Sequence, residues 1–238
     1  MRLKDKVAIV TGAGKGIGRA AALAAAAEGA TVVAVARTQS DLDETVRLIR
    51  ENGGTASSLS RDLTCGEQAA SMVDSVLQMY GRINILINNA GVQDSGRDID
   101  VNLRGTIYCT EKYGIQPNIK SIVMTASVSA HNGAEFPEYC ASKGGVLAYT
   151  KNVALRVAKY GATCNSISAG GVITELNAHI LENPALWDQV MAETLLPKWA
   201  TVEEMAEWTY FLAVVNQSMT AQDILIDNGE IAKANFVW

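Results

Sequence analysis

The stretch Thr11-Gly12-Ala13-Gly14-Lys15-Gly16-Ile17-Gly18 decides how this chain folds. It follows the apolar run at residues 7–10, and an Ala-rich stretch begins directly after it. Glycines at 12, 16 and 18 allow a tight turn, a close approach of a ligand to the backbone, and close packing of a helix on a strand. The free N–H groups at a helix N-terminus suit a phosphate. The stretch therefore predicts a strand–turn–helix unit that binds a dinucleotide, although a glycine-rich turn can also be a turn alone.

Outward from this unit, β-branched apolar runs alternate with helical stretches, which is the pattern of repeated βαβ units. We expect strands at residues 7–11, 31–36, 55–59, 83–88, 121–125, 163–167 and 223–226. We expect helices near 17–28, 41–51, 66–79, 102–115, 138–160 and 201–215, the last opened by a capping box at Thr201 and Glu204.

The strand at 31–36 shows no in/out alternation, which favours a parallel sheet buried on both faces. No Pro/Ser-rich linker, charge block or internal repeat divides the sequence. We therefore predict an α/β fold over residues 1–238, as a single domain. Its core is a doubly wound, Rossmann-type, seven-stranded parallel sheet with helices on both faces.

Composition excludes several classes of function. The chain has 238 residues and a net charge of −5, which argues against nucleic-acid binding. Its longest apolar run, residues 20–27, is too short for a membrane span, and the N-terminus lacks a secretion signal. Four widely spaced cysteines indicate reduced thiols and a cytoplasmic location, and two histidines are too few for a histidine-based metal site.

The end of the strand at 31–36 indicates which dinucleotide is bound. NAD-binding sites usually carry a carboxylate there for the ribose 2′-hydroxyl. Here Arg37 and Thr38 follow the strand, and the first acid is Asp41. With Lys15, they offer two cations and a hydroxyl to a 2′-phosphate, so we expect NADP(H) rather than NAD(H). The alternative is that both cations are ordinary solvated charges.

Tyr139 and Lys143 are four residues apart, so on a helix they lie on one face. An ammonium near a phenol favours the phenolate, and such a tyrosine can exchange a proton with a carbonyl or alcohol oxygen. Ser127 could hold the same oxygen. Tyr–Lys pairs at this spacing are also common on exposed helices.

Taken together, these features resemble the short-chain dehydrogenases/reductases, in order and approximate spacing. The matching motifs are Thr11 to Gly18, Asp62-Leu63, Asn88-Asn89-Ala90-Gly91, Asn102 in Val-Asn-Leu, Ser127, Tyr139-Cys-Ala-Ser-Lys143, and Asp227-Asn228-Gly229.

The resemblance implies a role for each catalytic residue. Tyr139 would be the general acid/base, and Lys143 would hold the nicotinamide ribose and acidify Tyr139. Ser127 would orient the substrate oxygen, with Ser129 as a rival, and Asn102 would anchor a water that links Lys143 to solvent. The residues implied in cofactor binding are Gly12, Lys15, Gly16, Ile17, Gly18, Arg37, Thr38, Asp62, Leu63, Asn89, Ala90, Gly91, Tyr139, Lys143, Ile173 and Thr174.

Some of these residues have a purely structural alternative. Asn88 and Asn89 could be turn-formers, and Asp62 could cap the next helix.

The resemblance implies an oxidoreductase that interconverts a ketone or aldehyde and an alcohol, and the residues Lys15, Arg37 and Thr38 lead us to expect NADP(H) as its cofactor. Its partner would be a small carbonyl or alcohol substrate, with no nucleic acid and no membrane, and it would form a homo-oligomer, either a dimer or a tetramer. The alternative is an NADP(H)-binding sensor or scaffold without turnover.

The sequence departs from the family pattern in three places. Two shortened segments motivate the sensor or scaffold alternative, and one substitution affects a loop of the site. Residues 91–102 form a shorter stretch than in most relatives, and Gly114 and Pro117 end the following helix early. In the family the helix after Asn102 usually contributes to a subunit interface, so these shortened segments weaken the inference of a standard tetramer. They could also open the substrate cleft. Ala169 stands where the family generally has proline, which puts the geometry of that loop in doubt.

Residues 172–200 are expected to form a lid over the substrate. Their apolar side chains recur every three to four residues, which favours core packing over a binding stripe. His131, Glu135 and Phe136 are expected to line the entrance, with His131 read as a surface-loop residue rather than a substrate contact. The pattern is compatible with a ketose or polyol, a 3-oxoacyl thioester, a steroid or a simple ketone.

Overall fold

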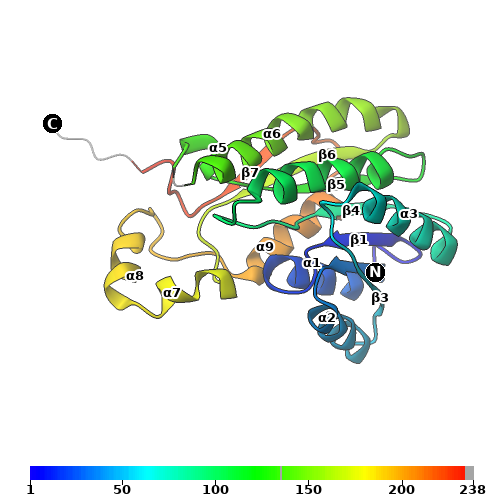
Figure 1. Cartoon of the computed structure of the whole chain (residues 1–238), viewed down its shortest axis with the longest axis horizontal. Helices are drawn as coiled ribbons and strands as arrows, with labels where there is room; N and C mark the ends of the chain where they lie inside the picture. The colour runs from blue at the N-terminus through cyan, green and yellow to red at the C-terminus, as the bar shows by residue number, and fades with distance from the viewer. Residues whose placement is uncertain (135, 234–238) are drawn as a thin grey trace.

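A computed structural model describes residues 1–134 and 136–233, and its strands form one parallel sheet (Figure 1). The strands are β1 (Val7–Thr11), β2 (Thr31–Ala36), β3 (Thr55–Ser60), β4 (Ile85–Asn88), β5 (Ser121–Ser127), β6 (Thr163–Ala169) and β7 (Asp223–Ile226). Their order across the sheet is β3-β2-β1-β4-β5-β6-β7. The order reverses between β1 and β4, which is where doubly wound sheets bind ligands beyond their carboxyl ends.

The helices connect the strands. They are α1 (Gly16–Ala27), α2 (Gln39–Glu51), α3 (Gly66–Tyr80), α4 (Gly105–Cys109), α5 (Ser129–Asn132), α6 (Pro137–Val157), α7 (Ala178–Leu181), α8 (Pro184–Met191) and α9 (Val202–Tyr210). Three π-helical segments, η1 (Ile99–Arg104), η2 (Thr110–Gly114) and η5 (Phe211–Val215), and two 3₁₀ turns, η3 (Ala158–Tyr160) and η4 (Glu175–Asn177), adjoin them.

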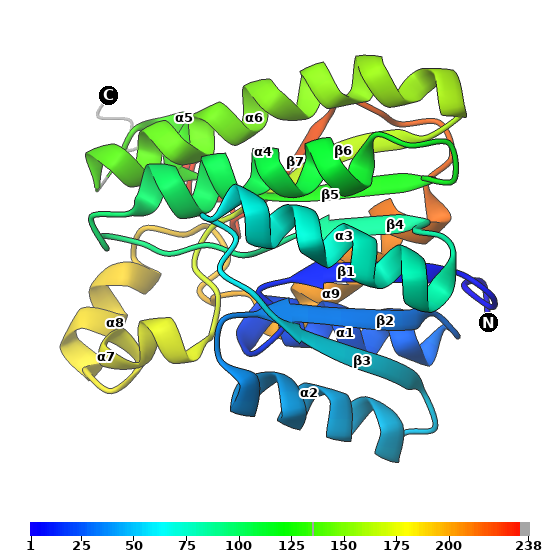
Figure 2. The same ribbon diagram turned by 45° about the vertical axis from the view of Figure 1, so that its right-hand side comes forward.

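The predicted fold class is confirmed: the sheet is parallel, seven-stranded and doubly wound, with helices on both faces. In Figure 2, α1, α2 and α9 lie on one side of the sheet, and α3, α4 and α6 lie on the other. Alternate residues of one strand enter opposite cores. Val32 and Ala34 pack with α1 and α2, whereas Val33 and Val35 pack with α3 and α6. Both faces of the strand are therefore apolar, which removes the in/out alternation.

Several boundaries differ from the prediction. β5 and β6 continue two residues beyond the expected ends, and β4 begins at Ile85 rather than 83. The expected helix at 102–115 is a composite of η1, α4 and η2 that begins at Ile99 and ends at Gly114.

Three short helices, α5, α7 and α8, are not predicted by the sequence pattern, because short helices carry little periodicity. The start of α8 was nevertheless signalled by Asn183 before Pro184, since the Asn183 side chain accepts a hydrogen bond from Leu186 N.

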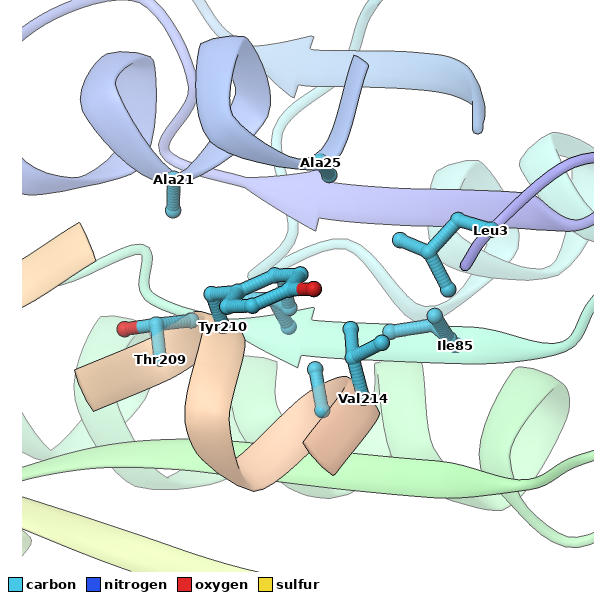
Figure 3. Close-up of a pocket in the computed structure, with 9 residues that line it drawn as sticks. Leu3, Ala21, Ala25, Ile85, Thr209, Tyr210 and Val214 are labelled. Carbon is cyan, nitrogen blue, oxygen red and sulfur yellow. The ribbon is translucent and has the colours of Figure 1, made fainter. Parts of the chain in front are cut away.

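A small apolar cavity lies between α1, α9 and the sheet (Figure 3). It is lined by Leu3, Ala21, Ala25, Ile85, Ile87, Thr209, Tyr210, Ala213 and Val214. The small side chains of Ala21 and Ala25 leave the space that larger residues would fill. None of the candidate site residues lines it, so this cavity belongs to the packing of the fold.

The structure also bears on thiols and membranes. Cys65, Cys109, Cys140 and Cys164 are all free, and burial raises the pKa of the Cys109 thiol to about 12. A helix with the length and hydropathy needed to cross a bilayer is not found in residues 1–134 and 136–233.

The capping box at the start of α9 is confirmed and generates a first prediction. The Thr201 side chain accepts from Glu204 N at 3.2 Å, and the Glu204 carboxylate accepts from Thr201 N at 2.9 Å. Thr201→Ala should lower the free energy of unfolding by about 1 kcal/mol, measured by urea titration. Thr38→Ala is the matched control, because Thr38 precedes α2 without a side-chain capping bond. Equal losses in both variants would contradict this account.

Candidate active site

The glycine-rich turn between β1 and α1 has the close contacts expected of a phosphate cradle. Gly12 has a φ of +66°, and a Cβ there would lie 2.8 Å from Ala90 Cα. At Gly18, a Cβ would lie 2.2 Å from the Gly12 carbonyl oxygen. Gly16 has a φ of +52° and faces Thr174, with its Cβ position 3.5 Å from Thr174 Cγ2. Side chains would fill or distort this turn, so its residues fit the pyrophosphate of a dinucleotide.

Thr11 and Asn89 join the ends of β1 and β4 beside the turn. Thr11 Oγ1 accepts from the backbone N–H groups of Asn89 at 3.0 Å and Ala90 at 3.1 Å. The Asn89 amide donates to the carbonyl oxygens of Thr11 and Gly12 at 3.3 and 3.4 Å. Asn88, buried at the end of β4, donates to Thr110 Oγ1 at 2.9 Å. Both asparagines therefore bond neighbouring segments, and reading them as turn-formers alone is wrong.

Arg19 and Thr45 support the same turn, and sequence reasoning missed them. Arg19 donates to the Gly14 carbonyl oxygen and, through Nε at 3.0 Å, to Thr45 Oγ1. Thr45 Oγ1 donates to the Ala13 carbonyl oxygen at 2.8 Å. Arg19 looks in the sequence like any solvated helix charge, so only the fold reveals this contact between α1, α2 and the turn.

The two cations expected at the end of β2 have different surroundings. Lys15 Nζ lies 3.4 Å from Asp41 Oδ1, so part of its charge is already compensated. Arg37 and Thr38 are exposed. Within residues 1–134 and 136–233 the Arg37 guanidinium has no hydrogen bond or ion pair. Arg37 is therefore the cation that is free to meet an incoming anion.

Tyr139 and Lys143 come together on α6, as their spacing predicts. Pro137 begins the helix, which places half-buried Tyr139 in the first turn and Lys143 one turn later. Lys143 Nζ lies 5.7 Å from the centroid of the Tyr139 ring and donates to the Thr125 carbonyl oxygen at 2.8 Å. The lysine is only 4% exposed. Burial lowers its pKa to about 8, and the Asp98 carboxylate opposes this lowering.

Ser127 ends β5, two residues beyond the Thr125 carbonyl that Lys143 contacts. It is buried, and its Oγ accepts from Ser129 N at 3.2 Å and lies 3.3 Å from Ser129 Oγ. The rival Ser129 is equally buried at the start of α5. The hydroxyls of both serines thus lie together at the carboxyl end of β5.

Asn102 lies within η1 and braces two segments of the site. Its amide donates to the Val92 carbonyl oxygen at 2.9 Å and to Ser142 Oγ at 3.0 Å, and its Oδ1 accepts from Val92 N at 2.8 Å. Ser142 in turn donates to the Tyr139 carbonyl oxygen at 2.7 Å. Both amide N–H groups of Asn102 are therefore occupied by protein, which fixes η1 against α6.

Asp62 lies two residues beyond β3 and is held by three groups. It accepts from Thr64 N at 3.0 Å and Thr64 Oγ1 at 2.8 Å, and Arg97 lies 3.6 Å away. These hydrogen bonds and the Arg97 charge hold the pKa of Asp62 below its usual value. The residue that caps α3 is Cys65, so the alternative that Asp62 caps this helix is wrong. Leu63, next to it, is buried.

Residues 172–200 leave the sheet after β6 and return before α9. A bridge between Val172 and Ala200 closes the base of this segment, and Ile173 N donates to the Ala200 carbonyl oxygen at 2.9 Å. Ile173 itself is exposed, and Thr174 lies beside Gly16. α7 and α8 project beyond the carboxyl ends of the strands in both views (Figures 1 and 2).

The apolar side chains of this segment divide into two groups. Trp199 is buried and packs edge-on against Trp187, with ring centroids 5.4 Å apart. Leu176, Leu195 and Leu196 are exposed, at 62%, 58% and 58%. Core packing is therefore the correct interpretation for Trp199 and the wrong one for these three leucines, whose side chains remain exposed to solvent.

The entrance residues agree with expectation in part. His131 is exposed at the surface, as expected, but it lies on the short helix α5 rather than in a loop. Its Nε2 lies 2.9 Å from Asp223 Oδ2 and 3.1 Å from Ser168 Oγ. It therefore joins α5 to β6 and β7. Phe136 precedes α6 and is half-buried, and Glu135 lies outside the described residues.

Backbone hydrogen bonds hold the loop after β6 at the position where the family generally has proline. The Ala169 carbonyl oxygen accepts from Val128 N at 3.0 Å, and Gly170 N donates to the Ile226 carbonyl oxygen at 2.9 Å. Bonds to both neighbouring strands thus hold the position where the sequence departs from the family pattern.

Comparisons with known proteins agree with this geometry. Residues 6–185 match the family model described as short chain dehydrogenase. The uncharacterized oxidoreductase YxbG of Bacillus subtilis is 36% identical over 97% of this chain and 93% of its own length. The 3-oxoacyl-acyl-carrier-protein reductase FabG of Thermotoga maritima is 33% identical over 96% of this chain and 99% of its own.

A similar fold is found in a crystal structure from Agrobacterium tumefaciens that holds bound NADP. The protein is provisionally named a 2-deoxy-D-gluconate 3-dehydrogenase. The TM-score is 0.88 at 29% identity, over 97% of this chain and 98% of that chain.

Burial of Lys143 predicts a pH-dependent cost in stability. Because folding lowers its pKa to about 8, the unfolded chain binds this proton more tightly, and unfolding takes up a proton between pH 8 and the ordinary value of 10.5. The stability of the wild type relative to Lys143→Met should therefore rise between pH 7 and pH 10. The rise should be on the order of 2 to 3 kcal/mol, at about 1.4 kcal/mol per pKa unit.

Urea unfolding of both proteins at the two pH values measures this difference, in which titrations common to both cancel. Lys112→Met, on exposed η2 surface, is the control, because its ammonium stays in water. The difference in unfolding free energy between wild type and Lys143→Met could instead be the same at pH 7 and pH 10. That result would show that burial does not destabilise the charged form of Lys143.

Proposed function

The chain belongs to the short-chain dehydrogenase/reductase family, and we propose that it is an NADP(H)-dependent oxidoreductase that interconverts a ketone or aldehyde and the corresponding alcohol. The observation that carries the proposal is the Lys143 ammonium, withdrawn from water and held 5.7 Å from the Tyr139 ring centroid. A positive charge in that position has no evident packing role, because an apolar side chain would fill the same space at lower cost. It does favour ionisation of a neighbouring phenol.

We assign the proton chemistry to this chain's own side chains. When bound, reduced nicotinamide supplies a hydride to the carbonyl carbon. Tyr139 then gives its phenolic proton to the carbonyl oxygen, and in the reverse direction it takes the proton of the alcohol. Ser127 donates a hydrogen bond to the same oxygen as negative charge develops there. Lys143 stabilises the phenolate and would hold the nicotinamide ribose hydroxyls.

Asn102 is proposed to support this set. Its side chain holds η1 to α6 through Ser142, one residue before Lys143. The water link from Lys143 to solvent, expected of Asn102, remains part of the proposal. It would not use the Asn102 amide N–H groups, which are taken by Val92 and Ser142.

The cofactor is proposed to lie across the carboxyl ends of β1 and β4. The turn from Gly12 to Gly18 would receive its pyrophosphate, Asp62 and Leu63 its adenine, and Asn89 to Gly91 the adenosine ribose. Ile173 and Thr174 would meet the nicotinamide carboxamide and the phosphates. Arg37, free and exposed, together with Thr38 and Lys15, would receive a 2′-phosphate. The related structure with bound NADP supports this choice of cofactor.

We propose that residues 172–200 form the lid over the substrate within a single catalytic domain. The base of the segment is closed at Val172 and Ala200, while α7 and α8 stand beyond the strand ends. Leu176, Leu195 and Leu196 place exposed apolar surface on this segment. Such surface suits a substrate with an apolar part next to its carbonyl group.

Association of copies into a homo-oligomer and a cytoplasmic location stay predictions. The surface that supports association lies at the β7 edge of the sheet, where Leu225 is exposed. On α9 and η5, Trp208 and Phe211 are also exposed, and their rings pack edge-on with centroids 6.2 Å apart. Exposed aromatic side chains of this kind are enriched at protein interfaces.

Tyr139→Phe tests the reaction. Loss of the general acid/base should lower turnover by about 10² to 10⁴-fold, because the phenolic proton has no substitute. Binding of NADPH should stay within about twofold, since the ring and its packing are kept. The measurements are NADPH oxidation with a panel of sugars, 3-oxoacyl thioesters, steroids and simple ketones, and a fluorescence titration of NADPH binding.

Tyr149→Phe is the matched control, because Tyr149 lies on the same helix and donates to Glu111 at 2.8 Å. It should keep its turnover. Near-normal turnover in Tyr139→Phe would overturn the assignment of roles. NADPH binding by the wild type without turnover of any panel member would favour the sensor or scaffold alternative.

Arg37→Ala tests the cofactor. Removing the guanidinium should weaken NADPH binding about tenfold to a hundredfold and leave NADH binding unchanged, because only NADPH carries the 2′-phosphate. Lys15→Ala should have a smaller effect, since Asp41 already compensates its charge. Equal losses for both nucleotides in Arg37→Ala, or tighter binding of NADH by the wild type, would refute the preference for NADP(H).

A further inference from the structure

A second buried charge lies in the site, and no role assigned so far uses it. Asp98 is 1% exposed and directly precedes η1. Its Oδ2 accepts from Ser95 N at 2.9 Å and from Ser95 Oγ at 3.0 Å. Its Oδ1 is buried and finds no hydrogen-bond partner within the described residues. One oxygen of this carboxylate thus closes a turn, and the other is left without a donor.

The fold brings Asp98 to the neighbourhood of Lys143 through Asn102. Asp98 lies four residues before Asn102, one turn away on the same helical segment. Asn102 and Lys143 meet at Gly91, where a Cβ would lie 3.3 Å from Asn102 Oδ1 and 3.5 Å from Lys143 Nζ. Asp98 therefore lies on the η1 side of the space in which the ammonium is buried.

Each of these charges is costly by itself. A buried ion without an opposite charge costs several kcal/mol, even when dipoles surround it. The hydrogen bond from Lys143 Nζ to the Thr125 carbonyl oxygen engages the ammonium but does not neutralise it. Asp98 is the side chain whose charge opposes the fall in the Lys143 pKa that burial causes.

Several other charged groups on the elements around Lys143 form ion pairs, and Glu138 and Lys151 on α6 are exposed to water. On η1, Arg104 pairs with Asp100 at 2.5 Å, and Arg97 before it pairs with Asp62. On α5, His131 pairs with Asp223, and at the far end of α6 Arg156 pairs with Glu111. Tyr139 on α6 is the titratable group whose ring the Lys143 ammonium faces.

Resting on the proposed function, we propose that Asp98 is a positioning residue whose carboxylate keeps the buried Lys143 ammonium charged, so that Tyr139 retains a positive neighbour at working pH. Asp98 acts through Lys143 and does not itself meet the substrate. Its loss should leave the amine easier to deprotonate, and the Tyr139–Lys143 pair would then release its first proton at lower pH.

The direct test is the titration of Lys143 by NMR in protein with ¹³Cε-labelled lysine, without nucleotide or substrate. Lys143→Arg identifies the signal. D98N keeps an acceptor for Ser95 and removes the charge, and it should lower the Lys143 pKa by about one unit, a roughly tenfold loss of proton affinity. D98E, which keeps the charge, should restore most of the wild-type value.

Asp100→Asn is the matched control. It removes one negative charge from the same segment, but Asp100 is half-exposed and faces Arg104. Its Lys143 titration should stay within about 0.3 pKa units of the wild type, because water screens an exposed charge. If D98N fails to fold, D98S supplies the neutral variant. A Lys143 titration that is the same in the neutral variant and the wild type overturns the proposal.

Turnover adds a second, separable readout. In carbonyl reduction, activity falls at high pH as the Tyr139–Lys143 pair loses its first proton. This alkaline limb should move to lower pH by about one unit in D98N and stay in place in Asp100→Asn. A shifted NMR titration in a protein without turnover would uphold the role of Asp98 and count against the oxidoreductase. An unshifted titration in an enzyme with turnover would overturn the role of Asp98 and leave the oxidoreductase function standing.

Discussion

The burial of one ammonium group is the constraint on which the site depends. Lys143 is withdrawn from water, and an isolated buried charge is unstable by several kcal/mol. Three elements interact with this ammonium in place of water. They are β5 through the Thr125 carbonyl oxygen, α6 through the Tyr139 ring and, in our proposal, the start of η1 through the charge of Asp98. Their convergence at the carboxyl ends of the central strands places a charge beside a phenol.

The glycine turn imposes the second constraint, and it is steric. Because Gly18 leaves no room for a Cβ against the Gly12 carbonyl oxygen, α1 packs closely on the end of β1. Asn89 then reaches the same carbonyl and joins β4 to the turn. The ends of β1 and β4 are thus held side by side at the point where the strand order reverses. The two constraints meet in the segment after β4, where Gly91 lies against both Asn102 and Lys143.

Physical chemistry explains which features were predictable from the sequence. The sheet was predictable because residues such as Val32 and Val33 enter opposite cores, so whole strands are apolar. The Tyr139–Lys143 pair follows from helical spacing alone. Arg19, Thr45 and Asp98 were not predictable, because an ordinary polar or charged side chain becomes a brace only when a distant segment folds against it. The contact between His131 and Asp223 was not predictable for the same reason, since the two residues are 92 positions apart.

The stretch from Gly91 to Asn102 is held by several contacts of this kind. Within it, Val92 is held on both sides by the Asn102 amide, and Ser95 closes a turn on Asp98. Arg97 lies over Asp62, so the stretch also reaches the region proposed for adenine. These contacts restrict the backbone conformations that residues 91–102 can adopt, because each hydrogen bond or ion pair fixes the chain near it. This stretch also carries the Asp98 carboxylate into the interior, and in our proposal the Lys143 ammonium is the opposite charge that this carboxylate serves.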